Sequence, residues 1–236
     1  MRFHTIALGA VFLISTTTAG ADFAGTIAVT SDYDYRGFSQ TAGDIALQGS
    51  LDYSHDSGFY ASAWGSTLDW GDDSDAKIEI DYIVGFSRPV GDGEVSWDVG
   101  LLYYSYPNLS SVNFLEIYGG FSAKYLNFKV SYSDDFAGVG ESAWYIDGGF
   151  NYGWENGWSV LAYGGYSFGS AFDRSKGLAL GVPDYFNWGA GVGYTWKSAY
   201  IELKAVDTTL NGIYVNEDGV FENDLRGILS VTVSIP

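Results

Sequence analysis

Residues 44–53 alternate almost strictly between polar and apolar side chains. Ile45, Leu47 and Leu51 fall on one parity, whereas Asp44 and Asp52 fall on the other. Because successive side chains of a strand point to opposite faces, this period of two predicts a β-strand with one apolar and one polar face. Such a strand fits a soluble sheet packed on a second layer. It also fits a membrane barrel with lipid outside and a polar lumen inside.

The same alternation recurs along the whole chain. We expect roughly twelve strands of about 9–13 residues, long enough to cross a bilayer when tilted. On the apolar face of these strands, the side chains are large and almost uncharged, as contact with lipid requires. The predicted strands are residues 23–33, 44–54, 58–69, 77–86, 94–103, 115–123, 126–133, 144–152, 158–168, 186–196, 201–205 and 225–235.

The connections between these strands alternate in length. Long polar links at 34–43, 71–76, 105–113, 134–142, 169–184 and 208–223 are separated by short ones at 54–57, 87–93, 124, 153–157 and 197–198. An outer-membrane barrel has long external loops, short periplasmic turns and an even number of strands. A soluble β-sandwich has no reason to keep this alternation.

Composition favours the barrel over the soluble alternatives. Aromatic residues make up 18% of the chain, with 8 Trp, 19 Tyr and 32 Gly. Tyr and Trp favour membrane–water boundaries, and Gly suits curved sheets. A propeller would need a repeat of about 40–50 residues, which the sequence lacks. We therefore predict an all-β fold: a transmembrane antiparallel β-barrel of about 12 strands, closed as an up-and-down meander.

The N-terminus has the features of a secretory leader. Arg2 supplies a basic start, residues 6–14 an apolar core, and residues 19–21 a small-residue cleavage site. We expect a signal peptide at 1–21 and an outer-membrane β-barrel at 22–236, located in the outer membrane of a Gram-negative bacterium. The chain has no cysteine, so this exported protein cannot rely on disulfides.

The chain is strongly acidic, with 11 basic residues against 29 acidic ones. Phosphate backbones are bound by clustered Lys and Arg, so nucleic acid is not expected as a partner. The expected partners are outer-membrane lipid, lipopolysaccharide, and small hydrophilic solutes or ions. The oligomeric state stays open.

Most charged residues of the predicted strands lie on the polar face, so we expect them to point into the lumen. Acidic residues outnumber basic ones there, which predicts a preference for cations if the lumen is filled with water. In the alternative arrangement, the charges pair across a narrow barrel and fill it. The predicted pore-lining residues are Asp44, Asp52, Lys77, Glu79, Asp81, Glu94, Asp98, Glu116, Lys129, Asp147, Glu202, Lys204 and Arg226, together with Arg36.

Arg36 belongs to the first long loop, between Tyr35 and Gly37. If Gly37 allows a sharp turn, the loop can fold inward and bring Arg36 to a carboxylate of the lumen, as a constriction or gate. In the alternative, Arg36 packs within the loops at the rim.

Neither catalysis nor a cofactor is expected. His55, the only histidine after the predicted leader, lies in a short turn without partners for acid–base or metal chemistry. Two acidic clusters, at 72–75 and 216–218, carry oxygen ligands that suit Ca²⁺, but neither has the full spacing of a calcium loop. Solvated charge explains both clusters better.

Residues 31–64 also carry a pattern of motifs. These are Ser31-Asp32-Tyr33, Tyr35-Arg36-Gly37, Ser39-Gln40-Thr41, Gln48-Gly49, Asp52-Tyr53, Ser57-Gly58-Phe59-Tyr60 and Trp64, with later echoes at 79–81 and 116–120. The pattern resembles the opening of the TorF-family porins, the Gcw_chp group of Gram-negative proteins. The resemblance implies an outer-membrane barrel and a pore, and it supplies no catalytic residue.

Two functional hypotheses follow from these observations. The first is a small passive pore for hydrophilic solutes that prefers cations. The second is a non-conducting structural or adhesion barrel that uses its long external loops.

Overall fold

The computed structural model describes residues 20–72, 74–173, 181–210 and 220–235, together with the backbone of 5–7 and 10–12. The predicted signal peptide therefore lies almost entirely outside the described residues. Two three-residue strands, β1 (Thr5–Ala7) and β2 (Ala10–Phe12), pair antiparallel within it. No helix in the described part of the chain is long and apolar enough to cross a membrane.

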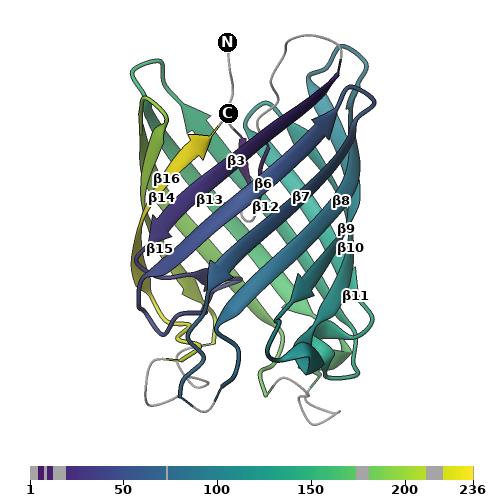
Figure 1. Cartoon of the computed structure of the whole chain (residues 1–236), viewed down its shortest axis with the longest axis vertical. Helices are drawn as coiled ribbons and strands as arrows, with labels where there is room; N and C mark the ends of the chain where they lie inside the picture. The colour runs from purple at the N-terminus through teal and green to yellow at the C-terminus, as the bar shows by residue number, and fades with distance from the viewer. Residues whose placement is uncertain are drawn as a thin grey trace.

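Twelve long strands of the described chain close into one antiparallel barrel (Figure 1). They are β3 (Ala21–Thr30), β6 (Ala46–His55), β7 (Phe59–Thr67), β8 (Ile78–Val90), β9 (Val95–Ser105), β10 (Phe114–Ala123), β11 (Leu126–Ser133), β12 (Ala143–Gly153), β13 (Trp158–Phe168), β14 (Tyr185–Trp196), β15 (Ala199–Thr208) and β16 (Arg226–Ile235). Each strand pairs with the next, and β16 pairs with β3 to close the ring. The predicted all-β, closed meander of 12 strands is confirmed.

The loops and turns separate to opposite ends of the barrel. In Figure 1, β3 begins and β16 ends at the end of the barrel with the short turns, and the long loops lie at the other end. The long loops also contain a two-stranded hairpin, β4 (Asp34–Tyr35) with β5 (Phe38–Ser39), and three short 3₁₀ turns, η1 (Ser110–Val112), η2 (Phe136–Gly138) and η3 (Ser170–Phe172). We call these two ends the loop end and the turn end.

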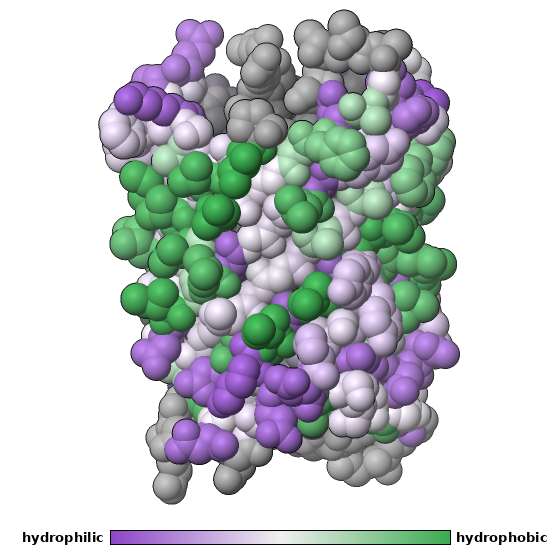
Figure 2. Space-filling view, viewed as in Figure 1, coloured by the Kyte–Doolittle hydropathy of each residue, from purple (hydrophilic) through white to green (hydrophobic). Residues whose placement is uncertain are grey.

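The outer surface carries an apolar belt around its middle (Figure 2). Leu51 is 75% exposed and Leu126 is 61% exposed, although both lie within strands. In water, so large a band of exposed apolar side chains would drive association, whereas in lipid it is satisfied. Exposed Trp154, Trp158 and Trp196 lie near the turn end, where an aromatic girdle meets the membrane interface. The belt and the closed fold place the protein in the outer membrane of a Gram-negative bacterium.

Several strand limits differ from the sequence prediction: β3 covers 21–30 instead of 23–33, and β15 covers 199–208 instead of 201–205. The strand expected to end at 86 continues to Val90, because β8 still pairs with β9 there. Pro89 is tolerated in this extension because the β7 ladder stops opposite Phe86, so no strand lies on its other side. In β7, Tyr60 is buried and Phe59 is exposed, so Tyr60 faces the lumen.

The lipid-facing parity gives a direct test. A lysine in place of Leu51, at the middle of β6, should destabilise the folded barrel by about 2–4 kcal/mol, because a charge at the bilayer midplane is poorly solvated. Urea titration in lipid vesicles, followed by gel mobility without boiling, measures this loss. Gln48→Lys, on the lumen face of the same strand, is the matched control and should cost less; equal losses would contradict the orientation.

Candidate functional site

The first long loop folds into a tight hairpin. β4 and β5 pair directly across a two-residue turn, Arg36–Gly37, with φ angles of 50° and 93°. Two successive positive φ angles are typical of the type I′ turn, which matches the twist of a two-stranded hairpin. Gly37 adopts this geometry freely, but a left-handed conformation at Arg36 costs about 1–2 kcal/mol. Contacts made by the hairpin must offset that cost.

Asp32 closes the base of this hairpin. Its Oδ1 accepts hydrogen bonds from Ser39 Oγ at 2.5 Å and from Thr41 Oγ1 at 3.1 Å. The backbone N–H of Gln40 donates to the carbonyl of Tyr33 at 2.7 Å. Residues 32–41 therefore form one compact unit, which we call the lumen hairpin.

Arg36 anchors the tip of the lumen hairpin to the barrel wall. Its Nη2 donates to both carboxylate oxygens of Glu116 on β10, at 2.7 and 2.8 Å. The guanidinium carbon lies 4.1 Å from the ring centre of Tyr145 on β12. The two charged side chains are 9% and 3% exposed. Arg36 thus points into the lumen. This is the inward-folded arrangement, one of the two alternatives predicted for the loop.

Arg226, on β16, anchors the other side of the hairpin. Its Nε donates to Asp32 Oδ2 at 2.9 Å, and its Nη2 donates to Asp34 Oδ1 at 2.6 Å and to the Gly37 carbonyl at 3.1 Å. Burial raises the pKa of the Asp34 carboxyl, an effect that the nearby Lys204 and Arg226 offset only in part. A proton therefore binds more tightly to Asp34 in the docked hairpin than in a released one.

Aromatic side chains fill the space around these ion pairs. Tyr35 packs edge-on against Tyr104 of β9, and Phe38 does so against Tyr185 of β14. The indole of Trp70 donates to Gln40 Oε1 at 3.0 Å. A buried cluster continues outward from these contacts through Phe114, Phe136 and Phe172. The hairpin thus contacts β9, β10, β12, β14 and β16, on several sides of the ring, and lies across the lumen at the loop end.

Between the hairpin and the turn end, the lumen wall stays polar and partly exposed. Asp98 accepts a hydrogen bond from Tyr60 at 2.6 Å, and Asp52 accepts one from Ser50 at 2.7 Å. Lys204 lies 3.6 Å from Glu202 on the same strand. These side chains are half-buried, unlike the fully enclosed ion pairs of the hairpin.

Three inward carboxylates near the hairpin each keep one buried oxygen without a hydrogen-bond partner in the described structure. They are Glu79 Oε1, Asp81 Oδ1 and Asp147 Oδ2. Glu79 is only 1% exposed. A buried carboxylate oxygen without a partner is unfavourable, so each of these groups gains from a hydrogen-bond donor that reaches it.

The predicted pore-lining residues divide into two groups. Eleven lie in or against the inner wall: Arg36, Asp52, Glu79, Asp81, Asp98, Glu116, Lys129, Asp147, Glu202, Lys204 and Arg226. Asp44, Lys77 and Glu94 do not belong with them. All three are exposed and lie just before β6, β8 and β9, where the alternation of a strand no longer fixes side-chain direction.

Sequence reasoning missed the acidic half of the hairpin. The prediction places Asp32 on the polar face of the first strand and Asp34 in the following loop, without a partner for either, yet both pair with Arg226. The signal was present in the alternation of Asp32, Asp34 and Arg36 with aromatic residues, followed by an Arg-Gly turn. The inward tyrosines at 104 and 145 were likewise not recognised as partners of Arg36.

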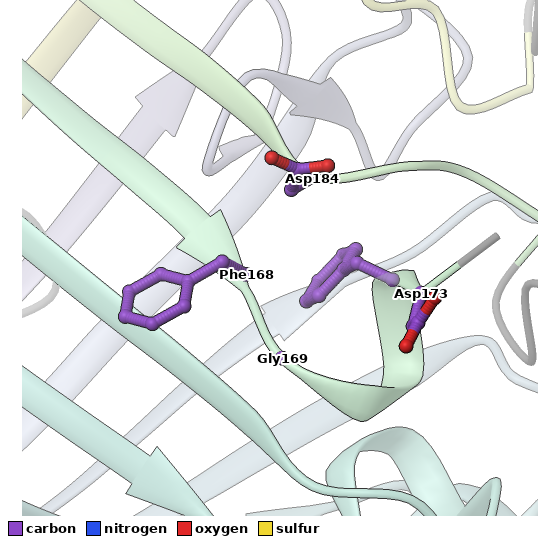
Figure 3. Close-up of a pocket in the computed structure, with 5 residues that line it drawn as sticks. Phe168, Gly169, Asp173 and Asp184 are labelled. Carbon is purple, nitrogen blue, oxygen red and sulfur yellow. The ribbon is translucent and has the colours of Figure 1, made fainter. Parts of the chain in front are cut away.

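A pocket of about 400 Å³ opens at the loop end beside β13 (Figure 3). Phe168, Gly169, Phe172, Asp173 and Asp184 line it. Asp184 accepts a hydrogen bond from Tyr166. The pocket lies at the rim and adjoins residues outside the described chain, so the lumen hairpin is the better defined site.

The other candidate sites carry less chemistry. His55 ends β6, is exposed, and contacts Ser57 Oγ at 2.8 Å through Nδ1. No group of three or more His, Asp or Glu side chains in the described part of the chain is arranged to hold a metal ion. Of the acidic clusters considered for Ca²⁺, residue 73 and residues 216–218 lie outside the described residues.

The architecture and site define a closed twelve-stranded outer-membrane β-barrel with a hairpin folded into its lumen. The chain also matches the model of the Gcw_chp family, described as bacterial proteins of unknown function, over residues 15–224, and it belongs to that family. A comparison with curated proteins found no match.

Among solved structures, the chain is similar to two porins. One is the NanC porin, with 13% identity, a TM-score of 0.57, and coverage of 90% of this chain and 99% of that one. The other is the KdgM porin in complex with disordered oligogalacturonate, with 10% identity, a TM-score of 0.56, and coverage of 92% and 100%. At these identities, the similarity concerns the fold.

The Arg36–Glu116 bridge can be tested by removing one partner. Breaking a buried ion pair costs about 3–5 kcal/mol, because the remaining charge stays desolvated. We expect Arg36→Gln to release the lumen hairpin, so that chymotrypsin cleaves folded protein at Tyr35 or Phe38. Arg88→Gln, at an exposed arginine of β8, is the control and should stay protected. Protection of Arg36→Gln would show that the bridge does not hold the hairpin.

Two glycines of the same loop offer a paired steric test. A Cβ at Gly37 would lie 2.3 Å from Thr208 Cγ2, whereas a Cβ at Gly43 would meet nothing within 4 Å. Both residues have positive φ angles, 93° and 77°, so both alanine variants carry similar backbone strain. Gly37→Ala should expose the hairpin to chymotrypsin at least tenfold faster than Gly43→Ala. Equal rates would argue against close packing of the turn on β15.

Proposed function

We propose that this protein is a passive outer-membrane pore for small hydrophilic solutes, that it prefers cations, and that the lumen hairpin closes it. The observation that carries this proposal is the hairpin itself. Two noncovalent anchors, at Glu116 and Arg226, hold it across a lumen whose wall is otherwise polar and partly exposed. A barrel built only for structural support has no need of a polar, partly exposed wall beneath the hairpin.

The charges of the wall favour cations. Seven inward carboxylates stand against three inward basic residues on the described strands: Asp52, Glu79, Asp81, Asp98, Glu116, Asp147 and Glu202 against Lys129, Lys204 and Arg226. An acidic lumen of low dielectric constant raises the local concentration of cations. It also disfavours polyanions such as the oligogalacturonate that accompanies KdgM.

The mouth of the barrel repeats this charge. Among the described residues of the loop end, exposed acidic side chains include Asp44, Asp72, Asp75, Asp134, Asp135, Asp184 and Asp224, and the exposed basic one is Lys77. The negative electrostatic potential of these carboxylates attracts cations toward the entrance. The same carboxylates suit contacts with lipopolysaccharide through bridging divalent cations.

The hairpin can move without breaking a covalent constraint. The chain has no cysteine, and loops connect both ends of the hairpin to β3 and β6. A twelve-stranded barrel is wider than the eight-stranded barrels that side chains alone fill. The resemblance of residues 31–64 to TorF-family porins and the porin fold both support a pore that opens when the hairpin leaves.

Conductance measurements test the proposal. We expect a variant with residues 34–39 replaced by a short Gly-Ser linker to give discrete conductance steps in planar bilayers, with a cation-preferring reversal potential in a salt gradient. The intact protein should show conductance steps at least tenfold less often than this variant. Gly37→Ala, which lacks any deletion, is a second way to open the lumen and should conduct more than Gly43→Ala.

The closed lumen also favours a second function, that of a non-conducting barrel whose long loops bind an external partner. Those loops, at 169–184 and 208–223, lie partly outside the described residues. If both hairpin variants fold, as judged by heat-dependent gel mobility, and yet give no conductance steps, the pore proposal fails. The structural or adhesion barrel then becomes the better account.

A further inference from the structure

The lumen around the hairpin has two poles of opposite charge. Glu116 on β10 binds the guanidinium of Arg36, and Arg226 on β16 binds the carboxylates of Asp32 and Asp34. These two strands lie six places apart in the ring of twelve, on opposite sides of the barrel. The hairpin is therefore held as a dipole, with its cationic tip at the acidic pole and its carboxylates at the basic pole.

The acidic pole is built to receive a cationic group. Tyr104 Oη donates to Glu116 Oε2 at 3.3 Å and orients that carboxylate. The face of Tyr145 lies 4.1 Å from the guanidinium carbon, and the ring of Phe136 lies 5.7 Å away. A carboxylate with aromatic faces around it binds guanidinium and ammonium groups generally, not the Arg36 side chain alone.

The basic pole is built to receive a carboxylate. Arg226 donates through Nε and Nη2 to two different carboxylates, so its guanidinium is preorganised for anionic oxygens. Tyr35 alone separates Asp34, in β4, from Arg36, whose left-handed backbone begins the turn. The hairpin itself therefore shows that charges on the first and third residues of a short peptide segment can reach both poles.

The hairpin can leave the two poles only if other charged groups take the places of Arg36 and Asp34. Glu116 and Arg226 are buried, and either one left without a counter-charge is strongly disfavoured. A solute that carries both charges relieves both poles at once, whereas a neutral sugar relieves neither. Release also relaxes the left-handed backbone of Arg36, at φ 50°, a strain that a free solute does not carry.

We propose that the lumen hairpin occupies the solute site of this barrel as an internal competitor. The solutes are small zwitterions of peptide size, whose guanidinium or ammonium group replaces Arg36 at Glu116 and whose carboxylate replaces Asp34 at Arg226. Binding of such a solute releases the hairpin. This inference rests on the proposed pore for its physiological meaning, but the binding site can be tested without conductance.

The first experiment measures release in the full chain. Ser39→Cys places a single thiol on β5, where the serine is fully buried, and the chain has no other cysteine. The probe is the end-blocked tripeptide Asp-Tyr-Arg, which reproduces residues 34–36. Saturating peptide should accelerate maleimide labelling at least tenfold. End-blocked Asn-Tyr-Arg and Asp-Tyr-citrulline, each lacking one charge, should accelerate it less than threefold.

The second experiment measures competition by calorimetry. Asp-Tyr-Arg should bind at least tenfold more tightly to the variant with residues 34–39 replaced by a linker than to the intact protein, because the internal competitor is absent. In that background, Glu116→Gln should abolish the preference for Asp-Tyr-Arg over the citrulline peptide. A gel without boiling confirms that each variant is folded, and Gly37→Ala replaces the linker variant if the latter does not fold.

The outcomes separate this inference from the pore proposal. Equal labelling with all three peptides, equal affinity for intact and opened barrels, or no binding to either overturns the inference. Tight, charge-dependent binding by an opened barrel that gives no conductance steps leaves the solute site standing and overturns the pore. Conductance by the opened barrel without charge-dependent peptide binding keeps the pore and overturns the inference.

Discussion

A strand in lipid has no water to pair with its backbone, and this constraint shapes the whole molecule. Every N–H and C=O of the membrane segment must be bonded within the sheet, and only a closed ring leaves no free edge. Pairing of β16 with β3 closes that ring. Once it is closed, the alternation of side chains sorts each strand into a lipid face and a lumen face, so almost all charge is directed inward.

Inward charge creates a second requirement, because the lumen near the loop end is too crowded to solvate it. Glu116 and Arg226 are buried there, and the lumen hairpin supplies a counter-charge for each. The hairpin therefore neutralises the buried charges of the lumen wall. Its own unfavourable feature, the left-handed backbone at Arg36, is held in place by these ion pairs and by the aromatic rings around them.

The strands and their orientation could be predicted from the sequence because both depend on local alternation. Residues 126–133 and 158–168 have the same limits in the structure as in the prediction. The prediction of side-chain direction failed just outside the strands, where the alternation ends. Asp44 and Lys77 lie just before β6 and β8, where no strand fixes the direction of their side chains.

The partners within the site could not be predicted for a different reason. Arg36 and Glu116 are 80 positions apart in the chain, and Asp34 and Arg226 are 192 apart. No sequence period connects such residues; only closure of the ring brings them together. The alternation along each strand predicts that Glu116 and Arg226 face inward. It leaves open whether Arg36 contacts a lumen carboxylate or stays at the rim.

The position of Arg226 has a consequence for the joint that closes the barrel. It opens β16, the strand that meets β3 at the seam of the barrel, and the lumen hairpin follows directly after β3. The paired seam runs from Thr30 opposite Ser230 to Gly25 opposite Ile235, and the Arg226 contacts to Asp32 and Asp34 extend it beyond the last paired residue. The hairpin therefore joins the two strands of the seam a second time, because Arg226 at the start of β16 binds the segment that directly follows β3.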